Sequence, residues 1–413
     1  MTRDDLQESF RETFGADAEV VYRAPGRVNL IGEHTDHSGL PVLPMAIQAS
    51  LWVAAAPTSD GIIRAVSAAF PQRAELPRNA PANQSEPWHR YLAGALIELA
   101  SCSPASGANV LIGGDLPSTG GLSSSSALSL GLIAALAACW GTAMTPSEVA
   151  QLAMTAERRV GVETGGMDQL AIAMGRVGHA LRIEFLPEAT RLVPLPTGLA
   201  FVVAYSGEAA PKGGSARDAY NERVIGARIA ALMLADMIGA ELEGTPLLGN
   251  VADIDAAAVM VDELPEQMSP RGAANAAEAD VERIVRLSGA HFDATRKVPV
   301  RRYAQHVLAE AERVDLAEQA LAAADLKAFG RLLNESHDSL RNQFRCSTPA
   351  LDKVAAAMRK AGAFGARLTG AGFGGYALAA CPPEAVARVI EAAVAATGGP
   401  AFEVKASDGL ERL

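Results

Sequence analysis

The segment GRVNLIGEHTD, residues 26 to 36, concentrates ionisable side chains among small and apolar residues. These side chains are Arg27, Glu33, His34 and Asp36. Pro25, Gly26 and Gly32 frame the segment and disfavour any long helix or strand through it. We therefore expect a shaped loop whose polar groups converge on a small polar ligand. Carboxylates accept strong hydrogen bonds from paired hydroxyls, so the acidic residues suit a polyol, and the arginine suits an anion.

A second loop, GGDLPSTGGLSSSSAL at residues 113–128, opens an Ala- and Leu-rich helix expected over 122–139. A helix N-terminus exposes backbone N–H groups and partial positive charge, so it binds phosphate. Ser123 to Ser126 add hydroxyls for phosphate oxygens or Mg²⁺. The alternative is a flexible turn with a serine N-cap, but the length of the loop and the strength of the helix favour phosphate. The chain contains no G-x-x-x-x-G-K-[ST], which excludes a Walker-type loop.

A third glycine-rich stretch, TGAGFGGYALAAC at residues 369–381, contains a formal G-x-G-x-x-G. A dinucleotide fingerprint needs a strand before it and a helix after it. Residues 375–381 are instead expected to form a strand, so we reject a Rossmann site. The remaining interpretations are a tight turn and a close approach of the backbone to a bound group, which glycine permits. The sequence favours neither of them.

Two carboxylates near residue 160 fit poorly as ordinary surface groups. Asp168 follows Gly165 and Gly166 and precedes the apolar run LAIAM. It is either a helix N-cap, the more frequent role for an isolated Asp, or a buried functional acid. Glu157 is expected at the C-terminal end of a helix, where the dipole disfavours an anion, and a bound cation would relieve that misfit.

The segment PWHRYL, residues 87–92, places two aromatic side chains, Trp88 and Tyr91, on one face of an expected helix. Packing in a hydrophobic core is the more frequent role for such a pair. Stacking on an adenine is the alternative.

Bulk charge and the N-terminus narrow the class of protein. The net charge of -11 disfavours a nucleic-acid or anionic-membrane partner. The N-terminal residues MTRDDLQESFRETFG contain no apolar signal region. The run from Leu128 to Trp140 is too short to span a bilayer, and the four cysteines lack metal-ligand spacing and are expected to be reduced thiols. We expect a soluble, cytoplasmic protein.

The hydrophobic patterns predict a mixed α+β fold. Further helices are expected at 1–14, from Trp88, from Thr145 to about Val160, and at 214–235, 301–323, 349–361 and 383–396. Further strands are expected at 49–56, 61–67 and 199–205, with a loop over 71–87. The helix from Thr145 begins with a capping box and a proline at the first helical position. The proline-containing loop at 186–198 suggests a boundary between domains of residues 1–205 and 206–413.

The three glycine-bearing segments, in this order, resemble the galactokinase family of the GHMP small-molecule kinases (galactokinase, homoserine kinase, mevalonate kinase and phosphomevalonate kinase). PGRVNLIGEHTD is similar to the galactokinase motif, LPSTGGLSSSSA to the phosphate-binding loop, and LTGAGFGGYAL to the third motif. The resemblance covers nearly the whole chain. It implies an N-terminal domain like domain 2 of ribosomal protein S5 and a C-terminal ferredoxin-like domain, with ATP and a sugar between them.

The same resemblance implies an ATP-dependent sugar 1-kinase that phosphorylates the anomeric hydroxyl of galactose and uses Mg²⁺. It makes Asp168 the catalytic carboxylate and Arg27 the arginine beside it. The implied sugar ligands are Glu33, His34, Asp36, Gly165 and Tyr220. The implied nucleotide contacts are Trp88 and the loop residues Gly120, Gly121, Leu122, Ser123, Ser124 and Ser125. Ser125 and Glu157 would hold Mg²⁺. We expect a small sugar as the partner, no nucleic acid or membrane, and a monomer.

Several positions depart from the family pattern. His37 stands where a tyrosine is usual, and Thr119 replaces a glycine of the phosphate loop. GGMDQ is closer to fungal galactokinases and N-acetylgalactosamine kinases than to the Cys-Gly-Ile-Met-Asp-Gln form of typical bacterial galactokinases. Galactose, N-acetylgalactosamine and other sugars therefore remain open as substrates. A non-catalytic regulator that binds sugar and ATP ranks lower, because Asp168, Arg27 and the loop serines are all present.

Overall fold

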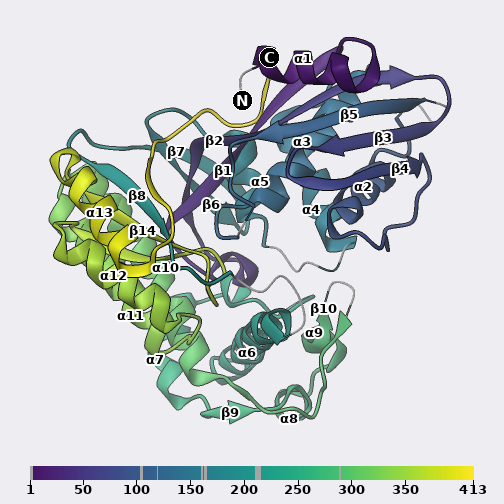
Figure 1. The fold of residues 1–413 in the computed structure, drawn as a ribbon. Coiled ribbons are helices and arrows are strands. Elements are labelled where there is room, and N and C mark those ends of the chain that lie inside the picture. The colour runs from purple at the N-terminus through teal and green to yellow at the C-terminus, as the bar shows by residue number, and fades with distance from the viewer. Residues whose placement is uncertain are drawn as a thin grey trace.

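The computed structural model describes residues 3–102, 106–118, 120–159, 161, 165–209, 215–287 and 290–413. The chain forms two lobes, the N-terminal one at the upper right of Figure 1 and the C-terminal one below it and to the left. The C-terminus returns to the first lobe and lies near α1 (Arg3–Phe14). This return is a strand pairing, because β16 (Glu411–Arg412) runs antiparallel to β1 (Val20–Ile31).

The sheet of the first lobe has six strands in the order β16-β1-β2-β5-β3-β4. Its other members are β2 (Leu43–Thr58), β3 (Ile62–Ser67), β4 (Phe70–Pro77) and β5 (Gly107–Gly114). Alternate side chains of β2 point to opposite faces, as in any strand. Val53 and Ala55 therefore join the main core, whereas Ala54 and Ala56 pack with α1 on the other face.

Four helices surround the main core of this lobe: α2 (Pro87–Glu98), α3 (Ser124–Cys139), α4 (Pro146–Arg159) and α5 (Met167–Met174). α3 is the central one, and nearly all of its side chains are buried. α4 begins with the predicted capping box, in which Thr145 N donates to Glu148 Oε2 at 2.7 Å and Glu148 N donates to Thr145 Oγ1 at 3.3 Å. The capping box sets where α4 begins, and so where the loop from α3 ends.

The second lobe is built on a four-stranded sheet in the order β13-β14-β8-β15. Its strands are β8 (Ala200–Tyr205), β13 (Gly365–Thr369), β14 (Tyr376–Cys381) and β15 (Ala401–Val404). Two helices, α12 (Pro349–Lys360) and α13 (Val386–Thr397), pack on the face that carries Val202. On the opposite face, α11 (Leu326–Asn342) packs the ring of Phe329 edge-on against Phe201. Both faces of this sheet are therefore covered.

Two long helices, α6 (Ser215–Met237) and α10 (Arg301–Ala322), pack on each other in the second lobe. α10 and α11 also contact β1 of the first lobe. The smaller elements are β6 (His179–Phe185), β7 (Glu188–Pro194), α7 (Ile254–Met260), β9 (Gln267–Met268), α8 (Pro270–Ala276), α9 (Glu282–Val285), β10 (Arg286–Leu287), β11 (Ala290–His291) and β12 (Val298–Pro299). Single turns of 3₁₀ helix occur at 36–38, 248–250, 261–263 and 383–385. None of the helices among the described residues has the length and apolar character needed to cross a bilayer.

The mixed α+β class and most of the expected elements are confirmed, but three local expectations are wrong. The loop expected at 186–198 contains β7, which pairs with β6. Residues 26–31 are the end of β1 rather than a loop. Register shifts at Pro25/Arg27 and Asn29/Ile31 accommodate the proline and glycine within the pairing to β2. The expected loop over 71–87 contains β4, whose mostly exposed edge position leaves it without an apolar signature.

The proposed domain boundary after residue 205 separates β8 from its own sheet. β8 pairs with β14 and with β15, both of which lie far along the chain. The strand expected at 199–205 is confirmed, and the position of the domain boundary stays a prediction. An apolar run identifies a buried strand but not its partners, so these pairings could not be predicted from the sequence.

Candidate active site

The first motif enters the site as a strand that touches the phosphate loop. A side chain at Gly26 would meet the backbone oxygen of Leu122 at 2.9 Å and would clash with the side chain of Leu116. Only glycine therefore lets β1 approach this loop so closely. The next residue continues the contact, because Arg27 N donates to Leu122 O at 3.2 Å. The two motifs meet through their backbones.

The predicted catalytic pair is formed. Arg27 Nε lies 2.7 Å from Asp168 Oδ1, and Arg27 Nη1 donates to Gly121 O at 2.7 Å. The second oxygen of the carboxylate, Oδ2, accepts from Ser123 Oγ at 2.5 Å. Gly166, not Asp168, is the N-cap of α5. The capping interpretation of Asp168 is therefore wrong, and its carboxylate instead joins the first motif to the phosphate loop.

Asp36 and Gly165 lie against each other beside this pair. A side chain at Gly165 would meet the carboxylate of Asp36 at 2.5 Å, so glycine leaves room for that carboxylate. Burial raises the pKa of Asp36 to about 6, and the negative charge of Asp168 acts in the same direction. Hydrogen bonds from the backbone N–H groups of His37 and Met167, and the charge of Arg27, oppose the rise. Two carboxylates thus share one small space.

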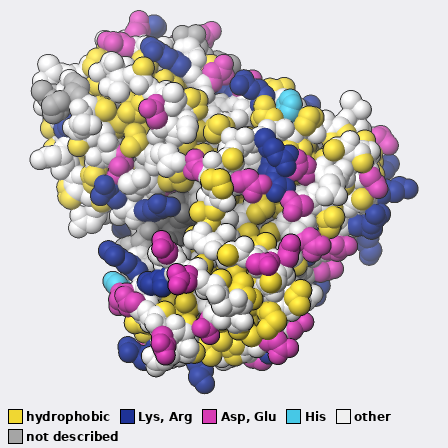
Figure 2. Space-filling view, turned by 180° about the vertical axis from the view of Figure 1, so that it is seen from behind, with side chains coloured by type: hydrophobic (Ala, Val, Ile, Leu, Met, Phe, Trp, Pro, Cys, Tyr) yellow, Lys and Arg dark blue, Asp and Glu magenta, His cyan; other side chains and the backbone are white. Residues whose placement is uncertain are grey.

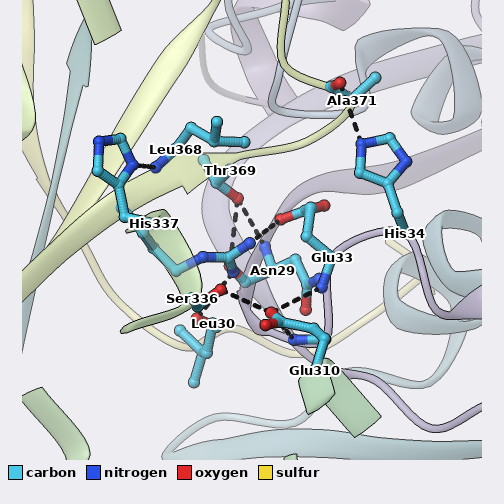
Figure 3. Close-up of polar contacts among 12 residues, drawn as sticks. Asn29, Leu30, Glu33, His34, Glu310, Ser336, His337, Leu368, Thr369 and Ala371 are labelled. Carbon is cyan, nitrogen blue, oxygen red and sulfur yellow. Dashed lines mark hydrogen bonds and ion pairs between the residues drawn. The ribbon is translucent and has the colours of Figure 1, made fainter. Parts of the chain in front are cut away.

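Glu33 is almost fully buried and pairs with an arginine from the other lobe. Arg367 Nη2 lies 2.7 Å from Glu33 Oε2. Burial nevertheless raises the pKa of Glu33 to about 7, against the charges of Arg367 and Arg27. Figure 3 shows Glu33 at the centre of a cluster that includes Asn29, Thr369 and Glu310.

His34 forms part of an aromatic wall. Its backbone is left-handed, with φ of 65°, and its ring lies 4.5 Å from Phe344 and 5.6 Å from Tyr220, between ring centroids. Burial holds the pKa of His34 well below its usual value, so the ring is neutral. Its Nε2 lies 3.1 Å from Ala371 O, which can only accept, so we assign the hydrogen to Nε2. This leaves Nδ1 as the atom that could accept from a ligand.

His37, which departs from the family pattern, lies against the same aromatic wall. The His37 ring lies edge-on to Tyr220, with 5.9 Å between centroids, and Ser38 Oγ lies 3.2 Å from His37 Nδ1. Burial lowers the pKa of His37 to about 3, so this imidazole is also neutral. The unusual residue therefore contacts Tyr220, a predicted sugar ligand. The second departure, Thr119, lies outside the described residues.

The phosphate loop and the third glycine segment pack backbone to backbone. Gly120, Gly121 and Ser123 all have positive φ just before α3 begins. A side chain at Gly370 would come within 3.1 Å of the Cα of Gly121, and one at Gly121 within 3.2 Å of Tyr376 N. Of the two interpretations of the third segment, close backbone approach fits this packing, but the group approached is the phosphate loop itself.

Of the two candidate cation ligands, Glu157 has a buried oxygen that fits the role, while the part of Ser125 stays a prediction. Glu157 is 3% exposed, and its Oε1 has no hydrogen-bond partner among the described residues. Burial raises the pKa of Glu157 to about 7, with Asp168 acting in the same direction and hydrogen bonds to Gln169 and Ser126 opposing. A buried, unpartnered carboxylate oxygen is costly unless a cation neutralises it. Carboxylate and hydroxyl oxygens are ligands that Mg²⁺ accepts.

Trp88 agrees with its core interpretation. Its ring is buried in the main core, one face is stacked on Phe70, and His89 meets it edge-on. Only 4% of Trp88 is exposed, so in this arrangement an adenine has little access to it. Contact with a nucleotide stays a prediction at this position.

Sequence reasoning missed two residues that hold the first motif. Arg367, at 0% exposure, and Glu310 both lie in the second lobe. The available signal was a lone arginine inside the apolar strand before the third segment, because an arginine is almost never fully buried unless it is paired. Glu310 had no local signal, since Glu is common on long helices.

Figure 2 shows a surface that is hollowed between the two lobes, with side chains of both charges along the rims. Within the described part of the chain, no group of three or more His, Cys, Asp or Glu side chains could hold a metal ion by itself. A cation at Glu157 would therefore take part of its coordination from a bound ligand or water, as Mg²⁺ commonly does with phosphates.

Three family signatures match the chain. The galactokinase galactose-binding signature matches residues 8–57, the GHMP kinase N-terminal domain residues 90–176, and the GHMP kinase C-terminal domain residues 317–399. The galactokinase of Roseiflexus sp. (strain RS-1) is 35% identical over 418 residues, covering 99% of this chain and 97% of the relative. The galactokinase of Homo sapiens is 32% identical over 404 residues, covering 94% and 91% respectively.

Solved structures give the same picture. Lactococcus lactis galactokinase complexed with galactose superposes with a TM-score of 0.78 at 28% sequence identity, covering 99% of both chains. Methanococcus jannaschii mevalonate kinase superposes with a TM-score of 0.64 at 18% identity, covering 94% of this chain and 98% of its own. The second likeness supports the fold alone.

Proposed function

The chain belongs to the galactokinase family of the GHMP kinases, and from this we propose that it transfers the γ-phosphoryl group of ATP to the anomeric C1 hydroxyl of D-galactose. The observation that carries the proposal is the contact set of Asp168. Its two oxygens are held by Arg27 of the sugar motif and by Ser123 of the phosphate loop. A group that touches both motifs stands where a sugar hydroxyl and a phosphoryl group would meet.

Asp168 has the chemistry to act on the attacking hydroxyl. Its carboxylate would accept the proton of the C1 hydroxyl, or orient and polarise that hydroxyl, as phosphoryl passes to the oxygen. The contacts at Oδ1 and Oδ2 fix the plane of the carboxylate before substrate arrives, which limits the misplacement that costs rate. Arg27 would also stabilise negative charge on the transferring group.

The sugar would lie against the carboxylates and the aromatic wall. Glu33 and Asp36 would accept hydrogen bonds from ring hydroxyls, and Tyr220 and the neutral His34 would line the same side. Gly165 supports this placement by leaving Asp36 its space. These contacts would fix the ring so that O1 faces Asp168, which converts binding into correct placement.

Ser125 and Glu157 would hold Mg²⁺ with the nucleotide. The buried Glu157 oxygen supports this role, because it lacks a partner among the described groups. When bound, the ion supplies neutralising charge at the β- and γ-phosphates. The loop residues Gly120 to Ser125 would cradle those phosphates through backbone N–H groups at the start of α3.

A panel of sugars tests the activity and separates it from its alternatives. Coupled ADP release is expected to give the highest kcat/KM with galactose, and ³¹P NMR should show a C1 phosphate. A higher kcat/KM with N-acetylgalactosamine would assign the enzyme to that sugar. The comparison matters here because His37, which departs from the family pattern, contacts the predicted sugar ligand Tyr220. Binding of ATP and sugar with no turnover of any sugar would favour the regulator instead.

The KM for galactose is expected to depend on pH. Burial raises the pKa of Glu33 to about 7 and that of Asp36 to about 6, so both carboxylates take up protons as the pH falls from 8 to 5.5. A protonated carboxyl accepts hydrogen bonds less strongly, so the KM should rise by about tenfold over this interval. Initial rates across the interval, with the KM for ATP measured alongside, check the prediction; a constant galactose KM would contradict it.

A further inference from the structure

The sugar motif is held from behind by a fully buried arginine of the second lobe. Arg367 lies on β13, two residues before the third glycine segment, and has 0% exposure. Its Nη2 donates to Glu33 Oε2 at 2.7 Å. Its Nη1 donates to the backbone oxygens of Leu30 at 3.0 Å and Asn29 at 3.2 Å. One guanidinium thus holds both the backbone at the end of β1 and the side chain of a predicted sugar ligand.

A carboxylate from α10 holds the next part of the same motif. Glu310 Oε1 accepts from Gly32 N at 3.0 Å, from Glu33 N at 3.2 Å and from Ser336 Oγ at 2.6 Å. Its Oε2 accepts from Arg313 Nε at 2.7 Å. Figure 3 shows the Glu310 carboxylate between the hydroxyl of Ser336 and the backbone of Glu33. The backbone position of Glu33 is therefore set independently of Arg367.

Arg367 and Glu310 hold different parts of the sugar motif. Glu310 holds the backbone amide of Glu33, whereas Arg367 holds the Glu33 carboxylate and, further back along β1, the backbone oxygens of two residues. A planar guanidinium fixes the direction of a carboxylate as well as its charge, which an ammonium does less well. Arg367 has 0% exposure, and the groups it holds in the sugar motif are the Glu33 carboxylate and the backbone at the end of β1. An effect on the sugar would pass through one of these two contacts, and a double variant with Glu33 distinguishes them.

We propose that Arg367 is a positioning residue for sugar recognition, which orients the Glu33 carboxylate toward the sugar and favours its charged form. The inference rests on the proposed function. It adds a residue from the second lobe, 334 positions from Glu33 along the chain, to the group that determines sugar affinity. The third glycine segment and the arginine before it then have separate roles. The glycines pack on the phosphate loop, and Arg367 acts on the sugar site.

The test compares Arg367→Lys and Arg367→Met with wild-type protein, using galactose and ATP as probes. The dissociation constant of galactose is measured by calorimetry, and both KM values by ADP release. Arg367→Met is expected to raise the galactose Kd and KM by about 10- to 100-fold, as for the loss of a charged hydrogen bond. Arg367→Lys should give an intermediate rise. The KM for ATP at saturating galactose should stay within about twofold in both.

A matched control separates positioning from general destabilisation. Arg78 is partly buried and, like Arg367, holds backbone, donating to the carbonyls of Leu96, Leu99 and Cys102. Arg78→Met should lower the melting temperature without changing the galactose Kd. If Arg367→Met does not fold, Arg367→Lys decides alone: a folded Lys variant with wild-type galactose Kd overturns the inference.

Two further measurements identify Glu33 as the intermediary. On a Glu33→Gln background, Arg367→Lys should add little to the galactose Kd, since the contact is already broken. In Arg367→Lys alone, the loss of galactose binding on acidification should begin at higher pH, because a poorer cation contact favours protonation of Glu33. Full additivity in the double variant, or equal rises in both KM values, would overturn the inference. Wild-type protein that neither binds nor phosphorylates galactose would overturn the proposed function, and this inference with it.

Discussion

Asp168→Asn is expected to lower kcat with galactose by about 10²- to 10⁴-fold, the range for loss of a general base. The galactose Kd should stay within about threefold of wild type, because an interaction made in the transition state is the one removed. The amide is isosteric and can still contact Ser123, but it cannot accept the hydroxyl proton or pair with the charge of Arg27. Steady-state ADP release measures kcat, and calorimetry measures the galactose Kd.

The control for this substitution is Asp325→Asn. Asp325 is an exposed N-cap of α11 that accepts from Ala328 N at 2.9 Å, and Asn caps helices about as well as Asp. It makes the same chemical change far from the site and should leave kcat unaltered. Turnover near the wild-type value in Asp168→Asn would refute the assignment of Asp168 as the base.

Glu157→Gln is expected to raise the Mg²⁺ concentration needed for half-maximal activity by about 10- to 100-fold, because a charged ligand is lost. The galactose Kd should change little, since Glu157 lies among the helices of the first lobe and not in the sugar motif. Activity is titrated with MgCl₂ at fixed ATP. Glu148→Gln on the same helix is the control, because Gln serves a capping box as Glu does.

The same variant carries a stability signature in the metal-free protein. Burial raises the pKa of Glu157 from its usual value near 4.5 to about 7, so the folded state binds a proton more tightly than the unfolded state. Stability from this group is therefore fully present below pH 4.5 and is lost as the pH rises through 7. Gln lacks this loss, so Glu157→Gln should be more stable than wild type above pH 7, by on the order of 1–3 kcal/mol.

Urea unfolding at pH 5 and pH 8 in EDTA checks this sign. The free energy of unfolding of Glu157→Gln minus that of wild type should be larger at pH 8 than at pH 5. A variant that is equally destabilised at both pH values would show that Glu157 is a structural group with satisfied contacts. It would then not be a ligand held ready for a cation.

Local signals in the chain predicted the parts that depend on local physics. The capping box at Thr145 and Glu148 needs four consecutive residues, and it formed as expected. The apolar run after the serine loop predicted α3, and the density of polar groups in residues 26–36 marked the centre of the site. Even so, glycine and proline in that segment suggested a loop, whereas bulges let the strand pass through them.

Long-range contacts decided the rest. Arg27 and Asp168 are 141 residues apart, and Glu33 and Arg367 are 334 apart. No local pattern of a few residues predicts these contacts, because they depend on how the two lobes and their sheets assemble. The resemblance to a family supplied the role of Asp168, but it did not supply Ser123 as its second partner.

Residue type and spacing were enough to predict the fold class, the three glycine-bearing segments and the acidic and basic residues available for chemistry. Which of those groups lie together depends on how the chain folds. The tertiary structure placed Asp36 beside Asp168, gave Glu33 a buried partner and left an oxygen of Glu157 without one among the described residues. The reason is physical: burial and neighbouring charge set the pKa and reach of a carboxylate, and both are properties of the packed interior.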